Sequence, residues 1–136
     1  MSTFLLEIVT PERKVYTQDA SMVIVKGVEG ELGILPNHVP LVTPLKIAPI
    51  IVKHAGGRDE ILAVHGGFME IRKDKVVILA ESAEEPGSID IDRAKAAKDR
   101  AQRRLEAMSR DNIDHVRAER ALLRAINRIE VTERKI

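Results

Sequence analysis

Proline, glycine and aromatic residues are confined to the first two thirds of this chain of 136 residues. All 6 Pro, all 8 Gly and all three aromatic residues (Phe4, Tyr16 and Phe68) lie at or before Gly87. Turns and strands use these residue types, whereas a helix interior largely excludes proline and glycine. The sequence therefore predicts two unlike parts, residues 1–87 and residues 88–136.

The first part is predicted to be antiparallel β structure. Short runs rich in β-branched and apolar residues recur at 4–9, 22–26, 50–53, 60–64, 68–71 and 75–79. Turn residues separate them at Thr10-Pro11, Gly56-Gly57, Gly66-Gly67 and Lys73-Asp74. This spacing of about 8–12 residues is typical of a sandwich or barrel, and it predicts roughly eight to ten short strands.

Four prolines crowd one stretch of this part, at Pro36, Pro40, Pro44 and Pro49. Proline has no backbone N–H to donate to a neighbouring strand. We therefore expect edge strands and crossing loops here rather than a central strand.

The second part is predicted to be two helices. From Asp90 to Met108 apolar residues recur at a three-and-four spacing that forms one helical stripe, at Ala94, Ala97, Ala101, Leu105 and Met108. Ser88 or Asp90 can cap its start. The pattern breaks at 109–112, where Asp111 can cap a second helix with apolar positions at Ile113, Val116, Leu122, Leu123, Ile126 and Ile129. The expected fold class is α+β, an N-terminal antiparallel β-sandwich or barrel followed by a C-terminal antiparallel two-helix hairpin.

The hairpin is expected to be only marginally stable by itself. Its seam is mostly alanine and it contains no aromatic ring, so at about 25 cal/mol per Å² it gains little from burial. It should depend on docking to the β part, to a ligand or to a partner. An element held by contacts on the order of a few kcal/mol can undock when they are lost, which is one way to build a switch.

The absence of cysteine and of long apolar runs excludes several classes of protein. With no Cys, disulfides, thiolate metal sites and cysteine nucleophiles are impossible. The longest apolar runs, such as 76–80, fall far short of the roughly 20 residues that span a bilayer. The N-terminus also lacks a basic segment leading into an apolar one, so we expect a soluble chain without a leader.

Catalytic and metal-binding patterns are lacking as well. The glycines of segment 27–33 match neither the phosphate-binding loop nor the dinucleotide fingerprint, and turn glycines explain them better. The histidines lack the close pairing of a zinc site, and each is expected to be an ordinary surface or interface residue: His38, His54, His65 and His115. No nucleophile elbow or His-Glu-x-x-His is present. We predict no catalytic residue and no metal ligand, and an independent enzyme is disfavoured.

Charge divides between the two parts. The net charge of +1 combines −3 in residues 1–87 with +4 in residues 88–136, where 13 Lys and Arg accompany 9 Asp and Glu. Two interpretations of the helical arginines stay open. A solvated face with i,i+4 pairs such as Asp99 to Arg103 explains most of them. The alternative is a stand-alone basic module for duplex nucleic acid or another polyanion; stacking of single strands is disfavoured because no aromatic residue is interleaved.

Four arginines are less easily explained as surface charge. Arg93 and Arg100 lie two turns apart on one side of the first helix, while Arg124 and Arg128 form an i,i+4 pair on the second. If the helices fold together, the four guanidinium groups can converge on one polyanion. The sequence therefore identifies them as candidate ligands of a phosphate compound.

Three segments of the chain resemble a known family. Segments 30–41 (GELGILPNHVPL), 66–71 (GGFMEI) and 89–94 (IDIDRA) resemble, in this order, the epsilon subunit of bacterial F-type ATP synthases. The resemblance covers essentially the whole chain. It implies an N-terminal β-sandwich before a C-terminal helical hairpin, in agreement with the division found above.

The resemblance implies a non-catalytic regulatory and coupling subunit of a rotary motor. The sandwich would dock on the gamma subunit and the c-ring, with Glu31 facing the c-ring, His38 facing gamma and Thr10 as a further rotor contact. The hairpin would fold on the sandwich or extend along gamma into the alpha/beta catalytic head, where it opposes ATP hydrolysis. The subunit would lie at the cytoplasmic face of the bacterial cell membrane, peripheral and associated only through the complex, and no nucleic acid is implied.

The resemblance also implies ATP as a regulatory ligand of the folded arrangement, without indicating whether Mg²⁺ takes part. Ile89, Asp90, Arg93 and Ala94 match an Ile/Leu-Asp-x-x-Arg-Ala motif through which several bacterial members bind ATP. The other matching positions are Glu84, Arg100, Arg124 and Arg128. Arginine forks would hold the triphosphate, while the two carboxylates and backbone groups would read the adenine or orient the arginines.

Overall fold

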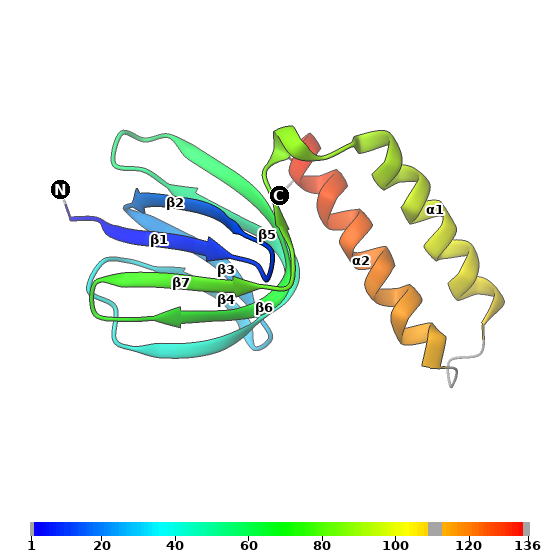
Figure 1. Ribbon diagram of the computed structural model, residues 1–136, viewed down its shortest axis with the longest axis horizontal. Helices are drawn as coiled ribbons and strands as arrows, with labels where there is room; N and C mark the ends of the chain where they lie inside the picture. Colours follow the sequence, from blue (N-terminus) through cyan, green and yellow to red (C-terminus); the bar gives the residue numbers. More distant parts are fainter. Residues whose placement is uncertain (1, 109–112, 135–136) are drawn as a thin grey trace.

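The computed structural model describes residues 2–108 and 113–134, which form two parts of unlike structure (Figure 1). The first part has eight strands, β1 (Phe4–Val9), β2 (Lys14–Ala20), β3 (Met22–Gly27), β4 (Gly30–Ile34), β5 (Leu41–Lys53), β6 (Asp59–Ile71), β7 (Lys75–Ala80) and β8 (Ala83–Glu84). A short 3-10 helix, η1 (Pro86–Ser88), leads to the helices α1 (Ile91–Ala107) and α2 (Ile113–Glu133). The predicted fold class, a β-sandwich followed by a two-helix hairpin, is confirmed.

The strands follow the order β2-β1-β7-β6-β5-β3-β4, with β8 beside β6. Most neighbours are antiparallel as expected, but β1 pairs with β7 in parallel, from Leu5 opposite Lys75 to Val9 opposite Leu79. Most of the sandwich sequence separates these two strands, so no tight turn imposes an antiparallel direction on them. The sheet encloses an aliphatic core whose largest members are less than 2% exposed: Leu6, Ile8, Ile34, Ile50, Leu62, Met69 and Ile78.

Two strands, β5 and β6, reach 13 residues and are longer than the sequence predicts. The turn expected at Gly66-Gly67 is wrong, because β6 continues through it. Both glycines have positive φ, 81° and 117°. A Cβ on Gly67 would overlap the carbonyl oxygen of Leu79. Glycine therefore lets one strand change direction, so that β6 pairs with β8 before this point and with β7 after it.

The expectation of edge strands around the prolines is wrong for two of the four. Pro44 and Pro49 lie within β5, which has β3 on one side and β6 on the other. The pairing of β3 with β5 shifts register across residues 46–50 of β5. This irregular stretch accommodates Pro49, whose missing N–H would interrupt a regular ladder.

Small residues form the seam between the two helices. Ala94 and Ala101 of α1 and Ala118 and Ala125 of α2 are all buried. The stripe predicted for the first helix is thus confirmed at Ala94 and Ala101, while its members Ala97, Leu105 and Met108 are half-buried. In α2 the buried positions differ from the predicted stripe, because its larger apolar residues Val116 and Leu123 are 56% and 44% exposed. Alanine lets two helix backbones approach closely where larger side chains would hold them apart.

The predicted start of the first helix is also confirmed. Asp90 is the N-cap of α1, and its side chain accepts a hydrogen bond from the backbone N–H of Arg93 at 3.1 Å. This bond satisfies one of the donors that a helix start leaves unpaired. The break predicted at 109–112, with Asp111 as the cap of the second helix, lies outside the described residues.

α2 lies between α1 and the sandwich (Figure 1) and packs on β5, β6 and η1. Asn127 of α2 is 2% exposed, and its Nδ2 donates to the carbonyl oxygen of Val64 in β6 at 3.1 Å. The hairpin therefore adopts the folded arrangement, docked to the β part.

Candidate functional site

A cavity of about 350 Å³ lies where the sandwich meets the start of the hairpin. Its lining comes from β8, η1, α1 with its cap, and α2, and consists of Glu84, Ser88, Asp90, Arg93, Ala94, Ala97, Arg100 and Arg128. The volume falls in the range of small-molecule sites. Folding thus gathers in one hollow residues from both parts of the chain.

The structure brings together most of the residues that the sequence predicts as ATP ligands. Six of the eight line the cavity: Glu84, Asp90, Arg93, Ala94, Arg100 and Arg128. Ile89, the C-cap of η1, and Arg124, one turn before Arg128 on α2, are not part of the lining. Sequence reasoning missed Ser88 and Ala97 as cavity residues. Ala97 could have been found, because it lies one turn after Arg93 on the same side of α1.

Glu84 connects the cavity to the sandwich interior. Its Oε1 lies 2.9 Å from Nε2 of His65 and accepts a hydrogen bond from Nε of Arg128 at 2.6 Å. The hydrogen bond with His65, and after it the one with Arg128, lowers the pKa of Glu84 to about 2. Glu84 is therefore ionised at neutral pH and partly offsets the charge of Arg128.

Arg93 and Arg100 supply the uncommitted positive charge of the cavity. Within residues 2–108 and 113–134, neither guanidinium takes part in an ion pair or a side-chain hydrogen bond. Both side chains are exposed. Asp90 is engaged as the cap of α1, whose N-terminus adds the positive end of a helix dipole. This arrangement suits an anion with several oxygens, such as a polyphosphate.

Behind Glu84 lies a histidine that the sequence does not single out. His65 of β6 is 1% exposed and belongs to the interface between sandwich and hairpin rather than to the surface. Burial is the main cause that lowers its pKa. A signal was available in the sequence, because His65 directly follows the apolar residues 61–64, of which 62–64 are buried in the middle of β6.

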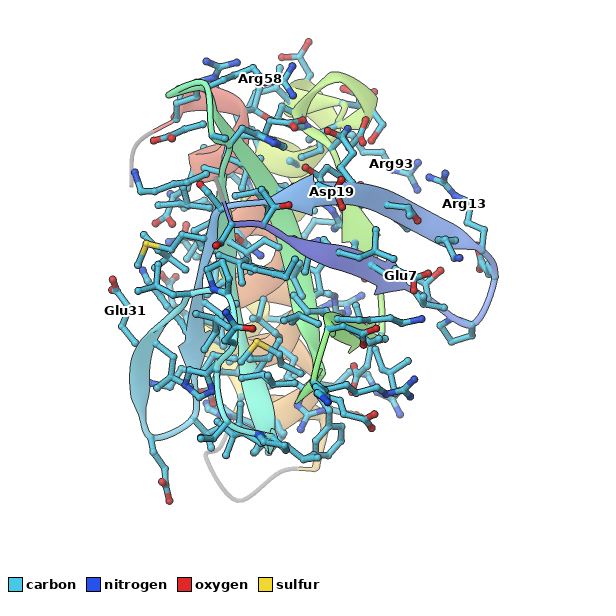
Figure 2. All side chains as sticks on the ribbon, turned by 90° about the vertical axis from the view of Figure 1, so that its left-hand side faces the viewer. Glu7, Arg13, Asp19, Glu31, Arg58 and Arg93 are labelled. Atoms are coloured by element: carbon cyan, nitrogen blue, oxygen red, sulfur yellow. The ribbon has the colours of Figure 1, made fainter. Side chains whose placement is uncertain are left out.

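The three predicted rotor contacts lie outside the cavity. Glu31 is exposed on the edge strand β4 and projects away from the sandwich (Figure 2). His38 lies in the loop between β4 and β5, where its Nδ1 is 2.7 Å from the carbonyl oxygen of Val39. Thr10 follows β1, and its hydroxyl donates to the carbonyl of Arg13 at 3.0 Å and accepts from the N–H of Arg13 at 3.2 Å.

An apolar row crosses four strands of the sheet beside Thr10. Pro44 is in register with Phe68, Phe68 with Leu79, and Leu79 with Val9. Phe68 is 53% exposed and Leu79 is 50% exposed. Contiguous exposed apolar side chains of this kind mark contact surfaces for other proteins. We call Val9, Pro44, Phe68 and Leu79 the outer apolar row.

Comparison with known families accounts for both parts of the chain. The family described as "ATP synthase, Delta/Epsilon chain, beta-sandwich domain" matches residues 3–86, and "ATP synthase, Delta/Epsilon chain, long alpha-helix domain" matches residues 88–133. The ATP synthase epsilon chain of Halalkalibacterium halodurans is 52% identical over 134 residues, which cover 98% of this chain and 100% of the relative. The chain belongs to the family of bacterial F-type ATP synthase epsilon subunits. The epsilon chain of Alkalihalophilus pseudofirmus is 55% identical over 132 residues, 97% of this chain and 98% of that relative.

Solved structures with the same fold come from mitochondrial ATP synthases. A chain of the Euglena gracilis OSCP/F1/c-ring structure has a TM-score of 0.78 at 22% identity, and the match covers 93% of this chain and 79% of that chain. A chain of the Tetrahymena thermophila central stalk and c-ring has a TM-score of 0.55 at 13% identity, and the match covers 98% of this chain and 96% of that chain. At such identities the likeness shows the fold alone. It agrees with the epsilon subunit family.

Within residues 2–108 and 113–134, this member of the epsilon subunit family shows neither a membrane-spanning helix nor a cluster of metal ligands. No helix in these ranges is long and apolar enough to cross a bilayer. The same residues contain no group of three or more His, Asp or Glu side chains placed to hold a metal ion.

Proposed function

We propose that the chain is a regulatory and coupling subunit of the central stalk of an F-type ATP synthase, and that ATP stabilises the folded state of its hairpin. The observation that supports this proposal best is the cavity lined by Arg93, Arg100 and Arg128 from both helices. In this proposal residues 1–87 are the rotor-docking domain. Residues 88–136 are the regulatory domain, which opposes ATP hydrolysis when it extends along gamma into the alpha/beta head. The subunit itself carries out no catalysis.

The cavity has the chemistry that a nucleoside triphosphate needs. Arg93 and Arg100 are free to bind phosphate oxygens with two donors each, and Arg128 approaches from the other helix. Glu84 and Asp90 can accept hydrogen bonds from an adenine amino group or keep the arginines in place. Ala94 and Ala97 leave room that larger side chains would fill.

Such a ligand would select the folded hairpin. The lining joins α1, α2 and β8, so a hairpin extended away from the sandwich would separate Arg128 from Glu84. ATP that contacts both helices and the sandwich edge therefore binds the folded state more tightly. It shifts the population toward that state by no more than its difference in affinity for the two states.

Calorimetric titration of ATP into the purified chain tests this site. We expect wild type to bind, and Arg93→Ala to bind roughly tenfold to hundredfold more weakly, since a hydrogen bond to a charged group is worth about 1.5–3 kcal/mol. Arg103→Ala is the matched control, because Arg103 is exposed on α1 and is not part of the cavity lining. Its affinity should stay within a few-fold of wild type.

Two results would count against nucleotide binding at this cavity. Equal weakening by Arg93→Ala and Arg103→Ala would indicate diffuse attraction to a basic helix instead of a site. The absence of any heat with wild type and both variants would remove ATP from the proposal and leave the subunit assignment intact.

The sandwich is proposed to bind the gamma subunit and the c-ring. The exposed carboxylate of Glu31, the loop that holds His38 and the outer apolar row beside Thr10 are the surfaces that suit these contacts. Through them the subunit would be peripheral to the cytoplasmic face of the bacterial membrane. Glu31→Lys should lower co-purification with a gamma and c-ring complex. Asp19→Lys, the same charge reversal on the exposed edge strand β2, should leave it unchanged.

A further inference from the structure

Beneath the cavity, four polar groups from three elements form a chain of contacts that runs from the buried interface to the half-buried Glu84. Nε2 of His65 lies 2.9 Å from Oε1 of Glu84, and Nδ1 of His65 lies 3.4 Å from Nδ2 of Asn127. Nδ2 of Asn127 also lies 3.1 Å from the carbonyl oxygen of Val64. His65 and Asn127 are 1% and 2% exposed, and neither belongs to the cavity lining.

The partners of Asn127 determine where the proton of His65 must be. The carbonyl of Val64 can only accept, so Asn127 must present its NH₂ group to it. The same NH₂ then faces Nδ1 of His65, which must therefore accept. Nε2 therefore carries the single ring proton and donates a hydrogen bond to Glu84. Only the neutral Nε2–H tautomer of His65 satisfies all these contacts.

A second proton on His65 would break this arrangement. It would sit on Nδ1 and point at the NH₂ of Asn127, so that two donors would face each other. Rotating the amide would offer Oδ1 to His65 but would turn the same oxygen toward the carbonyl of Val64. Oδ1 of Asn127 is buried and has no hydrogen-bond partner among the described residues. Leaving this acceptor unpaired costs free energy, which the hydrogen bonds of the NH₂ group at the same end of the side chain must offset.

The contacts continue from His65 into the cavity. Oε1 of Glu84, which accepts from His65, also accepts from Nε of Arg128. His65 therefore holds Glu84 from the sandwich side, and Glu84 holds Arg128 at the cavity wall. Asn127 is the neighbour of Arg128 on α2, so the same helix turn is tied to β6 and to β8.

We propose that His65 and Asn127 are positioning residues for the cavity, and that they keep α2 docked and Arg128 in place only while His65 is neutral. The part of this proposal that concerns ATP rests on the function proposed above. The part that concerns docking of the hairpin stands on the contacts alone.

The charged groups around His65 determine the direction of its pH response. Burial is the largest effect and lowers the pKa of His65. Arg128 and Arg124 on α2 also disfavour the protonated imidazolium form, whereas Glu84 on β8 favours it. Undocking exposes the ring and moves the arginines away, so the pKa returns toward about 6.5. Docking is therefore fully favoured above about pH 6.5. Below it, the equilibrium constant for docking falls by up to about tenfold per pH unit, because undocking takes up one proton.

Distance measurements between two labels test the docking without any nucleotide. The chain has no cysteine, so Gln18→Cys on β2 and Gln102→Cys on α1, both exposed, accept spin labels selectively. We expect the undocked population to rise at least several-fold from about pH 7.5 to about pH 5.5. In the same double-cysteine protein, His65→Gln keeps a hydrogen-bond donor for Glu84 but cannot take up a proton. The undocked population of this variant should therefore not change with pH. His115→Gln, on α2, is the matched control and should respond like wild type.

Two results would overturn the proposal. One is a wild-type distance distribution that is the same at both pH values. The other is a His65→Gln protein that responds as wild type does. If His65→Gln does not fold, the proton resonance of the His65 ring in the wild-type chain decides instead. A titration midpoint below about 6.5 supports the proposal, and one at or above this value overturns it.

ATP affinity provides the second readout. As the pH is lowered from about 7.5 to about 5.5, the ATP affinity of wild type should fall more steeply than that of His65→Gln. Protonation of ATP itself affects both proteins equally, so it cancels in this comparison. Parallel profiles would overturn the link between His65 and the cavity. If wild type does not bind ATP at either pH, the nucleotide proposal fails, while the label distances still decide the role of His65.

Discussion

Nε of Arg128 donates a hydrogen bond of 2.6 Å to Oε1 of Glu84, and both side chains line the same cavity. Arg128 lies on α2 and Glu84 on β8, so this bond ties the hairpin to the sandwich at the proposed ATP site. In the proposed function, docking and ATP binding thus share one side chain. A change at Arg128 must alter both, unlike a change at Arg93, whose guanidinium has no such bond within the described ranges.

Arg128→Ala is expected to weaken hairpin docking and ATP binding together. It removes the hydrogen bond between the guanidinium and the half-buried carboxylate of Glu84, which keeps His65 as its other partner. A hydrogen bond to a charged group is worth about 1.5–3 kcal/mol, and less where water reaches it. Label distances between positions 18 and 102 report docking, and calorimetry reports ATP affinity.

The control for this change is Arg117→Ala, which removes the same charge from an exposed position of α2. It should leave both measurements near wild type. If Arg128→Ala lowered ATP affinity while the label distances stayed those of wild type, the bond to Glu84 would not be a docking contact.

Acid is expected to weaken the sandwich through Glu7. This carboxylate is 6% exposed and pairs with Lys14 of β2 and Lys75 of β7, both at 2.5 Å. The hydrogen bond from Lys14, and then that from Lys75, lowers its pKa to about 2. Because the folded pKa lies below the unfolded one, the stabilisation is complete above about pH 4.3 and is lost as the pH falls toward the folded value.

Urea unfolding at several pH values checks this prediction. Fluorescence of Tyr16, the single tyrosine and a buried residue of the sandwich, reports unfolding of this part in a chain without tryptophan. The urea midpoint of wild type should fall more steeply below about pH 4.3 than that of Glu7→Gln. Glu12→Gln removes an exposed carboxylate and should keep the wild-type slope. Identical slopes for wild type and Glu7→Gln would show that Glu7 is not the acid-sensitive group.

A larger side chain in the alanine seam is expected to open the hairpin without unfolding the sandwich. Ala101 of α1 is 4% exposed, and Ala101→Leu adds volume where the helices touch, at a cost of about 1–3 kcal/mol. Amide exchange of α1 and α2 should quicken, while the Tyr16 transition stays where it is. Ala96→Leu makes the same change at an exposed position of α1 and should leave exchange slow. Faster exchange in both variants would mean that helix propensity, not the seam, controls the hairpin.

The division of the fold could be predicted because backbone chemistry is local. Proline and glycine act within a residue or two of their position, so their confinement to residues 1–87 indicates where helices begin. Asp90 caps α1 for the same reason, since its side chain reaches a backbone N–H three residues on. The parallel pairing of β1 with β7 and the passage of β6 through Gly66-Gly67 depend on distant partners, and local patterns do not contain them.

The candidate site shows the same limit at the level of side chains. Arg93 and Arg100 could be placed together because helix periodicity alone puts them on one side. Arg124 has the same kind of spacing relative to Arg128, yet only Arg128 lines the cavity. Which turn of α2 faces the hollow is decided by how the helix packs on β5 and β6.

The sequence by itself determined the two-part architecture, the cap of α1 and the family, because each depends on residue types at short, fixed spacings. Only the tertiary structure decided that His65 is buried, that Glu84 is held between it and Arg128, and that Ala118 and Ala125 form the seam. The physical reason is that burial and hydrogen-bond partners depend on the packing of elements far apart in the chain. Protonation of a histidine alters the packing of the chain only where another element covers the ring and fixes what its nitrogens must do.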